Sequence, residues 1–195
     1  MEIITQFNWI NLISLLFLVR ICYIAQKRGF LCEFVKLLGV FVASFFSFQY
    51  YSLFLSRFTT PPFSFNKESV ELVSFLIIFF IISIFFFFIR VLFSFFESQV
   101  HSPVEKGIAL LMGILRASLL ISVFLFLLGL SPFKSDYLYK NFSYKIWGQV
   151  APKTYLLFFK VYKEVNPAAK VNEEVKEYYE IKETLRRSSE KGNRS

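Results

Sequence analysis

The sequence predicts an all-α integral membrane protein with about four transmembrane helices and a charged, amphipathic helical tail. The chain of 195 residues is 55% hydrophobic, 18% charged and contains 28 Phe. Soluble domains carry about 25% charged residues, and their apolar residues follow a helical or strand period. Here the apolar residues come in unbroken blocks, and residues 72–89 contain no charge at all. Such a block is long enough to cross a bilayer core of roughly 30 Å.

Four apolar blocks fit this description, at about residues 9–25, 37–55, 70–88 and 107–130. The Phe-rich third block is too long for a strand and lacks polar alternation. Lipid also requires each spanning segment to satisfy its own backbone hydrogen bonds. We therefore expect four helices, which together form a transmembrane domain over residues 1–130.

The boundaries of these blocks carry turn and capping signals. Gly29 suits the left-handed position that ends the first helix, and prolines at 61–62 prevent the second helix from continuing. Ser102, Pro103 and Glu105 have the spacing of a capping box with proline in the first helical position. The sequence therefore predicts the start of the last spanning helix at Pro103.

Two adjacent cations, Lys27 and Arg28, occupy the short connection between the first two blocks. An excess of Lys and Arg in short loops marks the cytoplasmic side of a membrane. This places the N-terminus, and after four spans the C-terminal tail, outside the cytoplasm of a bacterial inner membrane. Three tail cations near the last span favour the opposite side for the tail: Lys134, Lys140 and Lys145. The short hairpin takes precedence because its helix inserts first.

Residues 131–195 differ from the rest of the chain. They hold 13 of the 22 Lys and Arg and 8 of the 14 Asp and Glu, so we expect a separate, water-facing tail that is disordered at its end. Residues 151–165 predict a helix in the headgroup plane. The net charge of +8 then favours anionic lipid headgroups over nucleic acid as partners. The residues expected at the membrane surface are Tyr155, Phe158, Phe159, Lys160 and Lys163.

Few residues can support chemistry. His101 is the only histidine, which excludes a histidine-based metal cluster or triad within one chain. Neither a phosphate-binding Gly-Lys-Ser/Thr loop nor paired intramembrane carboxylates are present. Cys22 and Cys32 flank the first hairpin, where a reducing compartment favours thiols over a disulfide. We therefore expect neither enzymatic activity nor a cofactor.

Arg116 is the most informative charged residue. Counted from Gly107, it lies about 13 Å into the last span, where an arginine is costly and marks a pathway or a partner. The alternative is that Arg116 snorkels to the cytoplasmic headgroups. Arg20 is a second intramembrane candidate, nearer to the surface.

Small residues mark the faces on which we expect helices to pack. Ala109, Gly113 and Ala117 form a ladder at four-residue spacing, and Gly39 and Ala43 form another. Glu33 and Lys36 lie three residues apart, which predicts an ion pair at the interface.

Two stretches resemble one known family. Residues 8–43 read NWINLISLLFLVRICYIAQKRGFLCEFVKLLGVFVA, and residues 105–121 read EKGIALLMGILRASLLI. In their order and spacing they are similar to the colicin V production (CvpA) family, over about residues 8–130. The departures are Asn11, Ala25 and Ala109, where the family commonly has Asp, Gly and Gly.

The resemblance implies a small bacterial inner-membrane protein that serves the production or export of a peptide toxin and envelope integrity. Some members resemble the membrane part of small mechanosensitive channels, and no enzymatic activity is established for the family. One hypothesis is therefore a channel- or transporter-like subunit. The other is a non-conducting scaffold that organises an envelope complex through its tail. Four spans make a narrow bundle, so a pore would need a homo-oligomer or other envelope proteins.

Overall fold

The computed structural model describes residues 9–27, 29–58, 67–95, 102–130 and 142–180, and this part of the chain contains helices but no strand. Four helices are long and apolar enough to cross a membrane, which confirms the predicted all-α membrane fold. Arg28, His101, the proline loop and the predicted disordered end lie outside the described residues. The helices are α2 (Trp9–Gln26), α3 (Phe30–Phe58), α4 (Lys67–Ser94), α5 (Pro103–Leu130), α7 (Phe142–Trp147) and α8 (Val150–Val165), followed by helical residues 173–180.

The helix boundaries differ from the predicted spans mainly where charged residues lie inside a helix. α3 begins at Phe30 rather than near residue 37, because Glu33 and Lys36 are accommodated within its first turns. α5 begins at Pro103, as the capping residues predict. The Ser102 amide donates to Glu105 Oε2 at 3.3 Å, and the Glu105 amide donates to Ser102 Oγ at 3.2 Å. This reciprocal pair satisfies two amides at the helix start.

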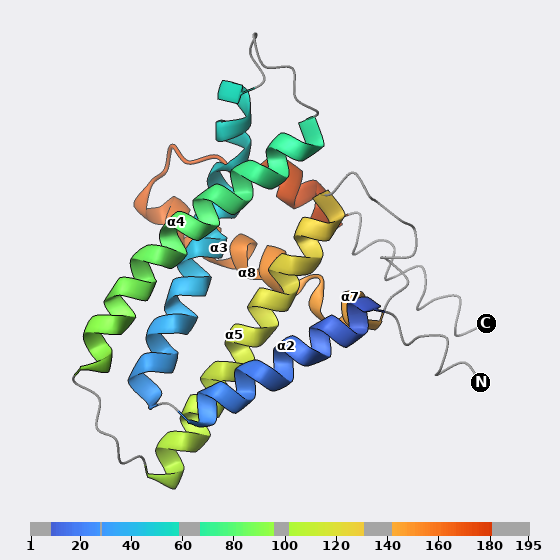
Figure 1. Cartoon of the computed structure of the whole chain (residues 1–195). Coiled ribbons are helices and arrows are strands. Elements are labelled where there is room, and N and C mark those ends of the chain that lie inside the picture. Colours follow the sequence, from blue (N-terminus) through green and yellow to red (C-terminus); the bar gives the residue numbers. More distant parts are fainter. Residues whose placement is uncertain (1–8, 28, 59–66, 96–101, 131–141, 181–195) are drawn as a thin grey trace, which may run out of the picture.

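The four long helices form two pairs, α2 with α5 and α3 with α4, and the contact between α5 and α3 joins the pairs. α2 packs on α5, α5 packs on α3, and α3 packs most extensively on α4. In Figure 1, α4 and α2 consequently lie on opposite flanks of the bundle. Because α2 ends at Gln26 and α3 begins at Phe30, the short connection keeps the C-terminal end of α2 and the N-terminal end of α3 together. The first turns of α5 extend beyond this connection.

Two glycines allow the closest helix approaches. A Cβ atom added at Gly113 would lie 2.6 Å from the Cβ of Ala25, so a side chain there would separate α5 from α2. A Cβ atom added at Gly39 would lie 2.7 Å from the Cβ of Phe86, at the crossing of α3 and α4. The other small residues of the predicted ladders, Ala43, Ala109 and Ala117, are also fully buried.

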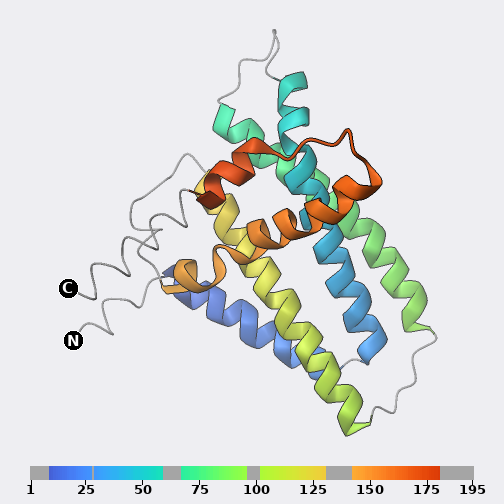
Figure 2. The same cartoon turned by 180° about the vertical axis from the view of Figure 1, so that it is seen from behind.

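The tail packs on the bundle instead of forming a separate region. α8 crosses α3 and α5 on the face seen in Figure 2. Its Tyr155 and Phe159 are buried in the main core cluster, which also contains Phe48 and Phe126. These two aromatics, predicted at the membrane surface, therefore contact protein. An amphipathic pattern shows that a helix has an apolar face but does not show whether lipid or protein covers it.

The remaining residues predicted at the membrane surface are accessible. Phe158 lies at the edge of α8, with its ring 4.4 Å from that of Phe41 between centroids, and is about half exposed. Lys160 and Lys163 are exposed. The outer side of α8 therefore carries cations beside apolar groups, as the headgroup-plane prediction requires.

Buried hydrogen bonds fasten the tail to α3. Asn172 Nδ2 donates to the Phe48 carbonyl at 2.8 Å, and Asn172 Oδ1 accepts from the Glu174 amide at 3.1 Å. The Tyr155 hydroxyl donates to Gln49 Oε1 at 2.7 Å and accepts from the Asn172 amide at 3.0 Å. Burial raises the pKa of Tyr155 to about 12, so this hydroxyl stays neutral at physiological pH. Asn172 thereby caps helical residues 173–180 and joins them to the bundle.

Gly113→Leu is expected to separate α2 from α5 and to lower the stability of the protein, because the new side chain meets the Cβ of Ala25. Gly107→Leu is the matched control in the same helix, since a Cβ atom at Gly107 has nothing within 4 Å. Both substitutions raise intrinsic helix propensity by a similar amount, roughly 1 kcal/mol. Thermal unfolding of the purified variants in detergent measures the difference. Equal melting temperatures for the two variants would contradict the close crossing.

Candidate functional site

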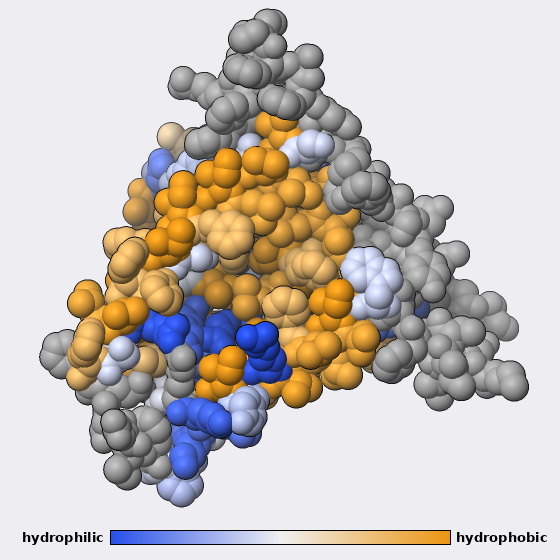
Figure 3. Space-filling view, in the orientation of Figure 1, coloured by the Kyte–Doolittle hydropathy of each residue, from blue (hydrophilic) through white to orange (hydrophobic). Residues whose placement is uncertain are grey.

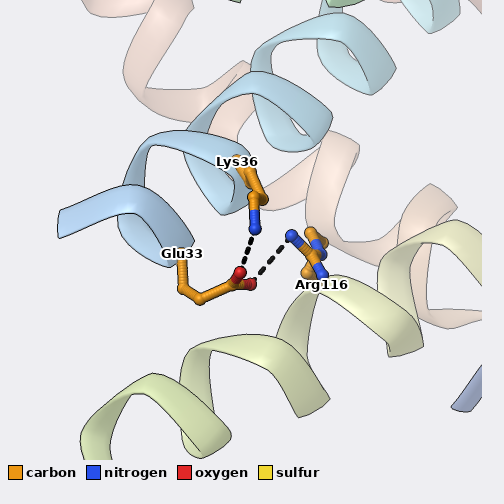
Figure 4. A network of polar contacts seen from close by, with 3 residues as sticks. All are labelled: Glu33, Lys36 and Arg116. Atoms are coloured by element: carbon orange, nitrogen blue, oxygen red, sulfur yellow. Dashed lines mark hydrogen bonds and ion pairs between the residues drawn. The ribbon is translucent and has the colours of Figure 1, made fainter. Parts of the chain in front are cut away.

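A buried carboxylate joins α3 to α5. The side chain of Glu33 is 0% exposed, and its Oε2 atom lies 2.8 Å from Nη1 of Arg116 on α5. Its Oε1 atom forms an ion pair with Nζ of Lys36, one turn further along α3. Figure 4 shows the carboxylate between the two cations. One carboxylate therefore forms ion pairs with two basic groups from different helices.

This arrangement differs from the expected interfacial pair. Glu33 and Lys36 do interact, but Glu33 is fully buried and is shared with Arg116. The three-residue spacing of Glu33 and Lys36 predicts only a contact within the same helix. The partner from α5 depends on how α3 and α5 pack, which the sequence does not state.

Arg116 lies on the packed face of α5, and its side chain is 8% exposed. Its partner Glu33 belongs to the first turn of α3, so Arg116 lies about one turn from the level at which α3 begins. The first turns of α5 extend beyond the turn between α2 and α3 (Figure 1), and the predicted depth of Arg116 in the membrane stays a prediction. Arg116 is consequently close to one end of the bundle but turned inward to a carboxylate.

A pocket of about 390 Å³ opens beside this ion-pair cluster. Its wall takes residues from all four long helices, including four cations: Arg20, Lys36, Arg90 and Arg116. Figure 3 shows a hydrophilic patch in a hollow of the otherwise apolar face between α4 and α2. We call this hollow the basic pocket. Glu33 forms ion pairs with Lys36 and Arg116, whereas Arg20 and Arg90 have no ion pair within the described residues, so the pocket carries an excess of positive charge.

The α4 wall of the basic pocket was not predicted as a site. Ser83, Phe86, Phe87 and Arg90 face the pocket at helical spacing. Ser83 Oγ and Arg90 Nε are buried atoms without a hydrogen-bond partner in the described part of the chain. The Arg90 guanidinium lies over the Phe87 ring, 5.8 Å from its centroid. The sequence feature that could have indicated this wall is the pair Ser83 and Arg90, seven residues apart in a run that is otherwise apolar.

The structure places the other candidate residues as follows. Arg20 is exposed at the rim of the basic pocket. Lys27 lies over the Tyr23 ring at 4.3 Å, on the turn between α2 and α3. Cys22 and Cys32 form no disulfide within the described residues. Within the described residues, no group of His, Cys, Asp and Glu side chains is suited to bind a metal.

Glu33→Gln is expected to destabilise the protein more than Arg116→Leu. Without the carboxylate, Arg116 and Lys36 remain as two buried or half-buried cations, whereas without Arg116 the carboxylate keeps Lys36. Breaking a buried ion pair typically costs about 3–5 kcal/mol. Thermal unfolding in detergent gives the order of the two variants.

Two further variants make this comparison decisive. Glu164→Gln removes an exposed carboxylate of α8 and should leave the melting temperature unchanged. The double variant Glu33→Leu/Arg116→Leu should be more stable than Glu33→Gln alone, because it removes both charges of the α3–α5 pair. If Glu33→Gln were as stable as the unsubstituted protein, the carboxylate would not hold the two cations.

Comparison with known proteins identifies the family. The family model described as "Colicin V production protein" matches residues 10–150, which is well over half of the chain. The match covers α2 to α5 and α7, and therefore all the walls of the basic pocket. No curated protein and no solved structure shows significant similarity to the chain. The four-helix membrane fold and the matched residues together show that this chain belongs to the colicin V production protein family.

Proposed function

We propose that this protein is a bacterial inner-membrane subunit that serves the production or export of a colicin V type peptide and envelope integrity. In this proposal the chain acts as a channel- or transporter-like subunit, and the basic pocket is where a solute enters the bundle. The observation that carries the proposal is a pocket of about 390 Å³ lined by four cations between apolar helices. Intramembrane charges are costly and by default mark a pathway or binding site.

The alternative is a non-conducting scaffold that binds envelope proteins through its tail. The firm docking of α8 and Asn172 on α3 supports this alternative, because it presents the exposed Lys160 and Lys163 in a fixed position. The two functions place the important residues on opposite faces of the bundle. Substitutions in the basic pocket therefore distinguish them.

We also propose that the end of the bundle with the short turn faces the cytoplasm. Lys27 lies in this turn, and Arg20, Lys36 and Arg90 lie within about 6–9 Å of the same end by helical rise. Concentration of cations at one end agrees with the positive-inside rule. The N-terminus would then face the periplasm.

Ser83→Trp tests the use of the pocket. The indole would fill part of the cavity beside Arg90 and is expected to abolish complementation of a deletion strain at normal membrane levels. Ile84→Trp is the matched control, because Ile84 is 54% exposed on the outer face of the same helix. Membrane levels measured by immunoblot separate loss of function from loss of protein. Full complementation by Ser83→Trp would contradict passage through the pocket and favour the scaffold.

The orientation is tested with single cysteines in a chain from which Cys22 and Cys32 have been removed. Lys27→Cys is expected to resist a membrane-impermeant thiol reagent in intact cells whose outer membrane is permeabilised. Trp9→Cys, at the other end of α2, is expected to react. The reverse pattern would invert the topology.

A further inference from the structure

The unpaired cations of the basic pocket indicate which class of ligand it accepts. Arg20 and Arg90 line the pocket and have no ion pair within the described residues. Arg116 and Lys36 share the single carboxylate of Glu33. Because each charge raises the cost of the others in a weakly polarisable surrounding, the pocket is poised for a negative ligand.

We propose that the basic pocket binds a phosphate-class oxyanion. The donors that carry this inference are the Ser83 hydroxyl and the Arg90 Nε–H group, which are buried at the pocket wall and have no hydrogen-bond partner among the described residues. A phosphate offers several acceptor oxygens and forms strong charge-assisted hydrogen bonds with guanidinium groups. Two negative charges would offset the positive charges of Arg20 and Arg90.

The position of the pocket favours an oxyanion that carries an acyl chain. The pocket is also lined by apolar residues, which include Phe17, Ile24 and Leu120. The hollow opens on the face between α4 and α2, where the surrounding surface is hydrophobic (Figure 3). Arg20, Lys36 and Arg90 lie about 6–9 Å from the ends of their helices by helical rise, a level that we place near the lipid phosphates. An anionic lipid can therefore enter from the side, whereas inorganic phosphate would enter from water.

This inference rests on the proposed function in one respect, because the same pocket would admit the solute. It states the chemistry of the bound group and is tested by binding instead of by complementation. The probes are phosphatidic acid, diacylglycerol with the same acyl chains, and inorganic phosphate at constant ionic strength. Each is titrated into the purified full-length chain in neutral detergent, and thermal unfolding reports the stabilisation.

Phosphatidic acid is expected to raise the melting temperature in a saturable manner, and diacylglycerol is not. Arg90→Gln and Arg20→Gln are each expected to weaken the apparent affinity roughly tenfold to a hundredfold, the range for one charge-assisted hydrogen bond. Arg90→Lys keeps the charge but loses the planar fork, so its affinity should lie in between. Lys153→Gln and Lys163→Gln remove exposed cations of α8 and should leave the affinity unchanged.

A saturable response to inorganic phosphate as well as to phosphatidic acid would support the oxyanion site and identify a free ion as a possible source. A response to phosphatidic acid alone would support the site and identify the lipid. Equal stabilisation by diacylglycerol, or full affinity in both Arg90→Gln and Arg20→Gln, would overturn the inference. Arg90→Gln should not lower the basal melting temperature, since it removes a cation that has no ion pair in the described structure and reduces the repulsion within the pocket.

Complementation separates this inference from the proposed function. Loss of phosphatidic acid binding in Arg90→Gln together with full complementation would support the site and contradict its use in the proposed function. Normal binding in Arg20→Gln and Arg90→Gln together with lost complementation would overturn the oxyanion site and leave the proposed function standing.

Discussion

The buried carboxylate of Glu33 determines how the two helix pairs meet. It lies between Lys36 on its own helix and Arg116 on α5 and forms an ion pair with each. Its negative charge makes it possible to bury Arg116 at a helix crossing, where an isolated cation would be strongly disfavoured. Arg20 and Arg90 have no ion pair with a carboxylate among the described residues. The ion-pair cluster and the basic pocket are therefore two consequences of one charge.

Close packing of small residues complements this polar contact. Gly113 brings α5 against Ala25 of α2, and Gly39 brings α3 against Phe86 of α4. Each helix pair is thus closely packed, while the space between the pairs stays open on one face. On the opposite face, Tyr155, Phe159 and Asn172 close the bundle with aromatic packing and buried hydrogen bonds. The basic pocket therefore opens on the face that α8 does not cover.

Much of this fold follows from local sequence signals. Unbroken apolar blocks predict the four long helices, and Ser102 with Glu105 fixes the start of α5. The tail was less predictable, because the apolar face of α8 has the same pattern whether it meets lipid or the core around Phe48. The sequence also pointed to Arg116, but not to Glu33 or Arg90 as its neighbours. Contacts between helices depend on rotation and tilt, which no local pattern states.

The outward face of α4 has a consequence for how this sequence can change over time. Its large side chains, such as Phe80, Phe85 and Phe88, are more than half exposed and contact no core cluster. In a bilayer, a leucine, isoleucine or valine at these positions would partition almost as well as phenylalanine. Such positions can drift freely among apolar residues. We therefore expect relatives of this chain to differ least at the inward positions, where a glycine, a serine or a charged residue packs against a specific neighbour.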